Sequence, residues 1–185
     1  MDRETNSGVD VLQAADNPSL AREDIEVIEH LKSKLVIMKT PPYGSDSWYT
    51  QAVGLFLGTT NKDWTNYVYG VNNDGHVVEW AYKAVEEKDR RHARDAELYV
   101  LTRVEEFMSE DAAGTLYMAQ TKGPCRSCRK IIKTVFMPYY ANVDVIIWYR
   151  QQSYNDEGMM YGIGDAQKHS SGWVAKWRSA ARRRS

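Results

Sequence analysis

The sequence predicts one domain with an α/β fold and a mixed sheet of about five strands. Residues 89–150 alternate between helical and strand patterns, in the order helix, strand, helix, strand. Strands joined through a helix in this way are expected to run parallel, with a right-handed crossover. In addition, 43% of the residues are hydrophobic and 26% are charged, as in globular chains, and 185 residues are enough to bury a sizeable core.

In the first half of the chain, the elements are predicted from local patterns. Residues 1–17 are polar and are expected to form a leader. Residues 18–35 are expected to form a helix, because apolar side chains recur there at helical spacing. Two runs rich in apolar, β-branched and aromatic residues, 51–60 and 65–75, are predicted strands. Residues 76–85 fit a strand or the start of a helix equally well.

In the second half, residues 89–108 are predicted to form an amphipathic helix and 114–120 a short strand. Residues 124–137 are expected to form the next helix. The nearly all-apolar run 143–150 is typical of a strand that is buried on both faces. Residues 151–185 are predicted to form a loop-rich extension that ends in a basic, helical tail.

Charge and hydropathy exclude several classes of protein. The formal net charge is −1, so the charge as a whole predicts neither a nucleic-acid partner nor a membrane surface. There is no apolar run of about 18 residues, so we expect no membrane-spanning helix. The first residues show no basic region followed by an apolar core, so we expect no signal peptide.

Both cysteines of the chain, Cys125 and Cys128, lie at the predicted start of a helix, after Pro124. Proline suits the first turn of a helix, because its missing N–H has no partner there. Free backbone N–H groups and the helix dipole are expected to lower the pKa of both thiols. The pair by itself fits a thiol–disulfide redox pair, half of a zinc site or two inert buried cysteines.

A second motif, Asp95-Ala-Glu97, opens the preceding predicted helix. Because the two neighbouring strands are expected to run parallel, the N-termini of the two helices that carry these motifs lie at one edge of the sheet. Asp95, Glu97, Cys125 and Cys128 are therefore expected to meet. The order of these two motifs is that of the H-x-E … P-C-x-x-C signature of zinc-dependent nucleobase deaminases, with Asp95 at the position of the histidine.

Three segments, 94–101, 114–136 and 142–149, resemble the cytidine-deaminase superfamily, and within it the toxin-deaminase domains of bacterial polymorphic toxins. Many members of that toxin family carry Asp-x-Glu where other deaminases carry His-x-Glu. The resemblance implies a three-layer α/β/α fold, with a deaminase domain over residues 18–150 and an extension over residues 151–185.

The resemblance also implies a role for each motif residue. Cys125 and Cys128 would bind zinc, and Asp95 would be the third ligand. Glu97 would be the catalytic proton shuttle. His92 is the alternative third ligand, because it precedes Asp95 by one helical turn. An aspartate ligand would give the site more negative charge than the usual histidine does.

By resemblance, the substrate is cytosine in nucleic acid, with single-stranded DNA favoured. The protein would be a toxin delivered into the cytoplasm of a competing bacterium, with a cognate immunity protein as its partner. Trp48, Tyr49 and Trp64 lie in or beside predicted loops and are candidates to stack on the base, although packing at the sheet edge explains them equally well. The basic tail would either hold a phosphate backbone or be a solvated end.

Two other functions are compatible with the residues. A thiol–disulfide oxidoreductase would use Cys125 and Cys128 without a metal, and it leaves Asp95-Ala-Glu97 unexplained. A non-enzymatic, zinc-stabilised module that binds nucleic acid would need a closed site with four protein ligands.

Overall fold

The computed structural model describes residues 20–35, 51–71, 79–84, 87, 95–151, 153–154, 160–161 and 166–183. The strands of its central sheet are β1 (Gln51–Gly58), β2 (Val68–Val71), β3 (Ala113–Lys122), β4 (Asn142–Gln151), β7 (Ala166–His169) and β8 (Gly172–Trp177). A separate two-stranded ladder consists of β5 (Ser153–Tyr154) and β6 (Met160–Tyr161).

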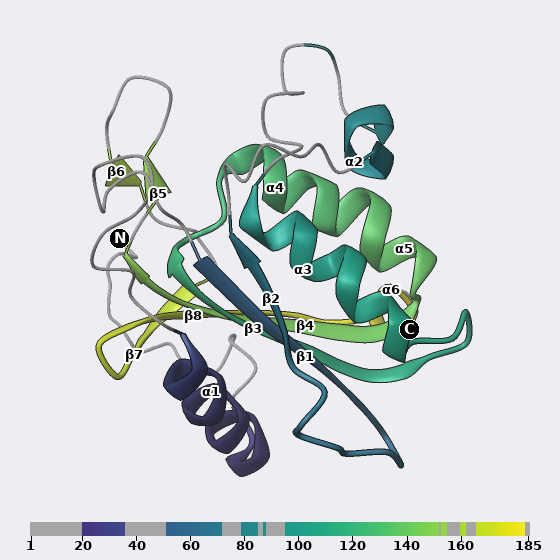
Figure 1. Ribbon diagram of the computed structural model, residues 1–185, viewed down its shortest axis with the longest axis horizontal. Helices are drawn as coiled ribbons and strands as arrows, with labels where there is room; N and C mark the ends of the chain where they lie inside the picture. The colour runs from purple at the N-terminus through teal and green to yellow at the C-terminus, as the bar shows by residue number, and fades with distance from the viewer. Residues whose placement is uncertain are drawn as a thin grey trace.

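The central sheet is mixed and has six strands in the order β2-β1-β3-β4-β8-β7 (Figure 1). Strands β3 and β4 are parallel, as predicted, and every other neighbouring pair is antiparallel. The predicted α/β class and the mixed sheet are therefore confirmed, with six strands instead of about five. Residues 143–149 of β4 are all buried, which confirms that this strand is covered on both faces.

The helices are α1 (Arg22–Lys34), α2 (Glu79–Ala84), α3 (Ala96–Val104), α4 (Arg126–Ile131), α5 (Met137–Tyr139) and α6 (Ala180–Arg183). A 3-10 turn, Glu105–Phe107, follows α3, and a π-helical turn, Ile132–Phe136, joins α4 to α5. The ambiguous run 76–85 is thus helical over Glu79–Ala84. In the part of the chain that the structure describes, no helix combines the length and apolarity needed to cross a bilayer.

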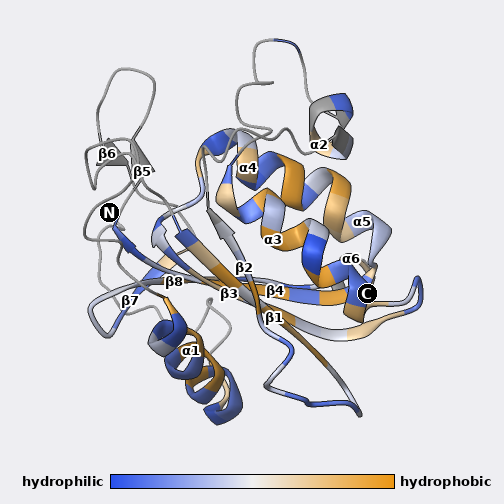
Figure 2. Ribbon diagram, in the orientation of Figure 1, coloured by the Kyte–Doolittle hydropathy of each residue, from blue (hydrophilic) through white to orange (hydrophobic). Residues whose placement is uncertain are grey.

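Helices cover both faces of the sheet, so the chain forms three layers (Figure 1). On one face, Val27, Ile28 and Leu31 of α1 pack against the apolar side chains of the central strands. Figure 2 shows hydrophobic and hydrophilic residues interspersed along the ribbon of α1. On the other face, α3 and α4 contribute residues such as Leu98 and Ile131 to a second buried cluster. This second face carries both motifs of the predicted site, and it is called the site face below.

Glycines allow α3 to lie directly on the sheet. A Cβ atom on Gly70 of β2 would lie 2.3 Å from the carbonyl oxygen of Ala96, and one on Gly54 of β1 would lie 2.2 Å from Cγ1 of Val100. Real Cβ atoms essentially never approach other atoms so closely. The two glycines therefore set the height of α3 above the sheet, and with it the position of Asp95 at the start of the helix.

The predicted helical tail is wrong for residues 172–177, which form β8 and pair with β4. Ala175 and Trp177 are buried in the core of the site face. Val174 is buried in the core of the opposite face, so β8 is covered on both sides, and burial beside β4 outweighs the basic composition that suggested a tail. The sheet therefore combines residues of the predicted 18–150 domain and of the predicted 151–185 extension.

The short helix α6 lies at the end of the sheet away from the cysteines. The backbone N–H of Ala181 donates to the carbonyl oxygen of Ala141, which precedes β4, and the N–H of Ser179 donates to Asp144 at 2.7 Å. Cys125, in contrast, follows the opposite end of the parallel strand β3. This part of the basic tail is therefore remote from the predicted site.

Three helix starts differ from the predictions by a few residues. The helix predicted for 18–35 begins at Arg22, with Ala21 as its N-cap. The helix predicted for 124–137 begins at Arg126, with Cys125 as its N-cap, so Pro124 precedes the helix instead of lying inside it. The helix predicted for 89–108 begins at Ala96, with Asp95 as its N-cap. Residues 1–17 and 88–94 lie outside the described residues.

Candidate metal centre

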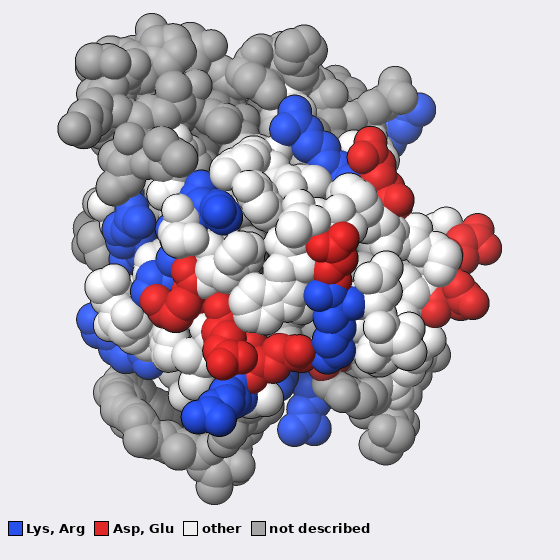
Figure 3. Space-filling model, turned by 60° about the horizontal axis from the view of Figure 1, so that its bottom comes forward, with Lys and Arg blue, Asp and Glu red and all other residues white. Residues whose placement is uncertain are grey.

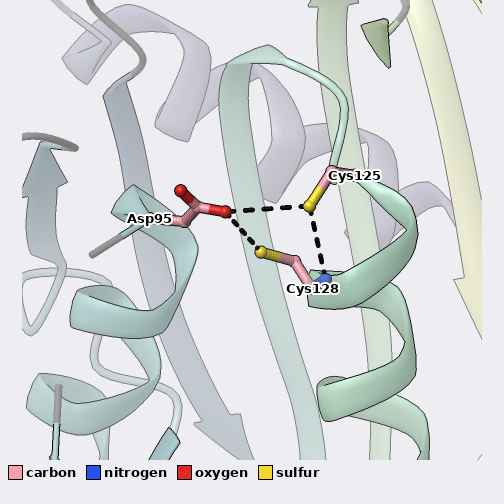
Figure 4. A group of neighbouring side chains, drawn as sticks. All are labelled: Asp95, Cys125 and Cys128. Carbon is pink, nitrogen blue, oxygen red and sulfur yellow. Dashed lines mark hydrogen bonds between the residues drawn. The ribbon is translucent and has the colours of Figure 1, made fainter. Parts of the chain in front are cut away.

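The two helices of the site face bring three metal-ligating side chains together. Asp95 is the N-cap of α3, and Cys125 is the N-cap of α4, with Cys128 one turn further on. Their ligand atoms all lie within 4.8 Å of one another. Figure 4 shows the three side chains pointing toward a common point between the helix starts. The predicted meeting of these motifs is therefore confirmed as a geometric fact.

The distances within this cluster are short. The Cys128 thiol donates to Oδ2 of Asp95 at 2.9 Å, and the Cys125 Sγ lies 3.7 Å from the same oxygen (Figure 4). The backbone N–H of Cys128 donates to the Cys125 Sγ at 3.4 Å. One carboxylate oxygen thus faces both sulfur atoms.

Asp95 does not act as an ordinary N-cap. An aspartate at this position normally accepts a hydrogen bond from an N–H of the first helical turn. Here the Asp95 side chain makes no such capping bond, although its backbone has the extended conformation of an N-cap. Its carboxylate is directed to the cysteines, so helix capping does not explain why an aspartate lies here.

The loop before α4 is held against β4. The N–H of Gly123 donates to the carbonyl oxygen of Gln151 at 2.8 Å. Gly123 also lies on the ring of Tyr149, because a Cβ atom at this position would come within 3.0 Å of it. The loop that carries Cys125 is therefore fixed to a central strand, which fits a site with defined ligand positions.

The donor set fits a zinc ion. Around a tetrahedral zinc with bonds of about 2.0–2.3 Å, ligand atoms lie roughly 3.3–3.8 Å apart. The 3.7 Å separation of Cys125 and Asp95 falls in this range, and the 2.9 Å contact of Cys128 with Asp95 would open slightly around an ion. Two thiolates and a carboxylate are ligands that zinc accepts, and three protein ligands leave a fourth position open, as in catalytic sites.

Glu97 lies beside the cluster and is only 4% exposed. Its Oε2 accepts a hydrogen bond from Nε2 of Gln120 at 2.6 Å, and its Oε1 lies 3.4 Å from the Cys128 Sγ. Burial raises the pKa of Glu97 to about 8, the negative charges of Asp95 and Cys125 act in the same direction, and the bond from Gln120 opposes the rise. A cation bound at the cluster would also oppose it.

The expectation of a lowered thiol pKa is wrong for Cys128. This side chain is fully buried, and burial raises its pKa well above the ordinary value. The hydrogen bond with Cys125 and the charges of Glu97 and Asp95 raise it further. The acidic neighbours and the loss of solvent thus outweigh the helix start. Coordination to a metal ion would remove this penalty, because a metal-bound thiol loses its proton.

The remaining predicted site residues are not part of the cluster. His92, Trp48 and Tyr49 lie outside the described residues. Trp64 packs against the core of the opposite face, and its ring lies 5.3 Å from that of His30 in α1. The structure therefore does not bring Trp64 to the metal cluster, and packing explains this tryptophan.

Among the described residues, the surface of the opposite face carries acidic as well as basic side chains (Figure 3). Acidic and basic side chains lie next to each other there (Figure 3), and Lys62 pairs with Glu23 at 2.8 Å. Lys32 pairs with Glu29 at 3.1 Å. Among the described residues, this mixed surface is not the continuous basic surface that a phosphate backbone requires.

The prediction from sequence missed a row of side chains that crosses the site face. Gln120 of β3 is paired with Tyr149 of β4, Tyr149 with Trp173 of β8, and Trp173 with Lys168 of β7. The Tyr149 and Trp173 rings stack at 6.0 Å, and the Lys168 Nζ lies 4.5 Å from the centre of the Trp173 ring. The alternation of apolar residues along β3 would have placed Gln120 on this face.

No protein-family model matches the chain, and neither a curated protein nor a solved structure matches it. The resemblance of the two motifs to deaminases therefore supports a proposal about function and does not establish a family.

Proposed function

We propose that the chain is a zinc-dependent hydrolytic deaminase that converts cytosine to uracil in nucleic acid, with single-stranded DNA favoured. One observation carries the proposal: a buried glutamate, Glu97, lies against a cluster of three zinc-type ligands. A metal-ligand cluster alone would suit a structural site. The adjoining buried carboxylate is the group that moves protons in deamination.

Asp95, Cys125 and Cys128 would hold the ion. A zinc ion supplies an activated water at neutral pH, because it lowers the pKa of water from about 15.7 to about 7. Three protein ligands would leave a fourth position of the ion open for water or substrate. Cys128 and Asp95 come from different helices, so the site forms only in the folded chain.

Glu97 performs the proton transfers of the proposed reaction. It takes a proton from the attacking water and delivers it to the ring nitrogen, while the water oxygen bonds to the carbon that carries the amino group. It then moves the second water proton to the amino group. The carbon–nitrogen bond breaks, ammonia leaves and a carbonyl group remains. No electrons are gained or lost, so no redox partner is needed.

Trp173 and Lys168, in the row of side chains that starts at Gln120, support a nucleotide as the substrate. Trp173 is partly exposed and packs beside the core of the site face, and Lys168 is exposed above its ring. An aromatic ring with a nearby cation suits a base and its phosphate. By resemblance to polymorphic toxins, the protein would act in the cytoplasm of a target bacterium and be neutralised by an immunity protein.

A direct test measures bound zinc and uracil release on single-stranded DNA and RNA. The variants are Glu97→Gln and, as a control, Glu106→Gln, which changes an exposed glutamate in the turn after α3. We expect about one zinc ion per chain in all three proteins. We expect uracil release by the wild type and the control, and a loss of about 10²–10⁴-fold in Glu97→Gln.

Other outcomes point to specific alternatives. Zinc without uracil on either polymer contradicts cytosine in single strands as the substrate and directs the search to duplexes, adenine or free nucleotides. Absence of zinc, together with a reversible Cys125–Cys128 disulfide, contradicts the proposal and favours the oxidoreductase.

A further inference from the structure

Gln120 belongs to the inner strand β3 and contacts Glu97 in the first turn of α3. Its side chain is fully buried, and its Nε2 donates to Oε2 of Glu97 at 2.6 Å. We propose that Gln120 is a positioning residue, which orients the Glu97 carboxylate toward the metal cluster. This inference rests on the proposed function, because it assigns Gln120 to the proton transfer that Glu97 performs.

The two oxygens of Glu97 have different surroundings. Oε2 faces the amide of Gln120, and Oε1 faces the Cys128 Sγ at 3.4 Å. The terminal torsion of a glutamate is broad, so a carboxylate without a partner would sample many orientations. A short bond to one oxygen fixes the plane of the group. Oε1 is therefore the oxygen held next to Cys128, where it would receive the proton of a water activated at this cluster.

The orientation of the amide follows from its partner. An ionised carboxylate only accepts hydrogen bonds, and the NH₂ end of Gln120 is the end that donates to Glu97. The other end, Oε1 of Gln120, is buried and has no hydrogen-bond partner among the described residues. An unmet buried acceptor is unfavourable for folding.

Packing does not explain a glutamine at this position. Its neighbours in register are Ala52 on β1 and Tyr149 on β4, and the preceding residues of β3 on the same face are Leu116 and Met118. An apolar side chain of the same length would fill this position without an unmet acceptor. The contact with Glu97 is what a glutamine adds.

The strand that carries Gln120 holds this side chain in a fixed position. Strand β3 lies in the middle of the sheet and is paired on both sides over most of its length. Glu97, in contrast, lies in the first turn of a helix. A group held on a central strand can fix a catalytic side chain within the narrow tolerance that proton transfer requires.

The test replaces Gln120 with methionine, which has a similar length and no N–H. The control is Gln51→Met, which changes another buried glutamine, on β1. We expect Gln120→Met to lower kcat by roughly tenfold or more. KM is expected to stay within about twofold of the wild type, with zinc content unchanged, because neither the ligands nor the substrate contacts change. Gln51→Met is expected to retain the wild-type kcat.

Two results would overturn the inference: a wild-type kcat in Gln120→Met, or an equal loss of kcat in both methionine variants. If Gln120→Met does not fold, Gln120→Asn is used instead. It keeps an amide that is one methylene too short to reach Oε2 of Glu97, so the same loss of kcat with retained zinc is expected.

A second measurement does not depend on activity. In a double-mutant cycle, the stabilities of Gln120→Met, Glu97→Met and the double variant are compared by urea denaturation. We expect the double variant to be clearly more stable than the sum of the single changes predicts. Additive changes would refute the contact. If the wild type releases no uracil but the cycle shows coupling, the proposed function has failed and the Gln120–Glu97 contact stands.

Discussion

Replacing Gly70 with alanine should displace one side chain of the metal-ligand cluster, Asp95, although Gly70 is not part of that cluster. The new Cβ atom would lie 2.3 Å from the carbonyl oxygen of Ala96 and 3.1 Å from side-chain atoms of Tyr99 and Val100. Ordinary contact begins at 3.4 Å, so the start of α3 would have to move by about 1 Å. Ala96 lies between the ligand Asp95 and the proposed proton shuttle, so both would move with it.

The expected change in the free energy of unfolding combines two effects. Overpacking of this kind costs about 1–3 kcal/mol in the free energy of unfolding. An alanine also restricts the unfolded chain, which offsets about 0.4–1 kcal/mol. A displacement of about 1 Å at a catalytic group can lower turnover by roughly 100-fold. Gly70→Ala is therefore expected to lose more activity than its modest loss of stability would suggest.

The assay compares urea denaturation, zinc affinity and uracil release for the wild type, Gly70→Ala and Gly58→Ala. Gly58 is the matched control on β1, because a Cβ atom there would meet its nearest neighbours at 3.6–3.7 Å. We expect the control to stay within about 0.5 kcal/mol of the wild type, with unchanged zinc affinity. Equal stability and equal zinc affinity in the two variants would refute the argument that Gly70 sets the position of Asp95.

Three further predictions concern other parts of the fold. Tyr117→Phe removes the 2.6 Å hydrogen bond to the buried Asp24. It should therefore lower the free energy of unfolding, measured by urea denaturation, by about 1–3 kcal/mol. The control, Tyr139→Phe, changes an exposed tyrosine and should cost less than about 0.5 kcal/mol. A chelator should lower the melting temperature of the wild type, and zinc should restore it, because a metal held by this cluster would bind only the folded chain. Asp95→Ala should abolish this difference in a thermal scan. Deletion of residues 166–185 removes β7 and β8 and exposes one edge of β4. The shortened chain should therefore show no cooperative unfolding transition by circular dichroism. An unchanged transition would contradict the role of β8 in the core.

Several features could be predicted because they depend on local patterns. The apolar run of β4 indicates a strand that is buried on both faces, and a helix between two strands indicates a parallel pair. These two facts bring the starts of α3 and α4 to one edge of the sheet. That is why the cluster of Asp95, Cys125 and Cys128 could be inferred from two short motifs.

Other features depend on contacts between distant residues, which no local pattern contains. The sequence by itself determined the α/β class, the parallel central pair and the three candidate ligands, because spacing along the chain fixes which residues share a face and an edge. Only the tertiary structure decided that residues 172–177 join the sheet, that Trp64 packs on the far face, and that Gln120 holds Glu97. It also decided the raised pKa of Cys128, because burial and the charges of neighbours from other elements set that pKa.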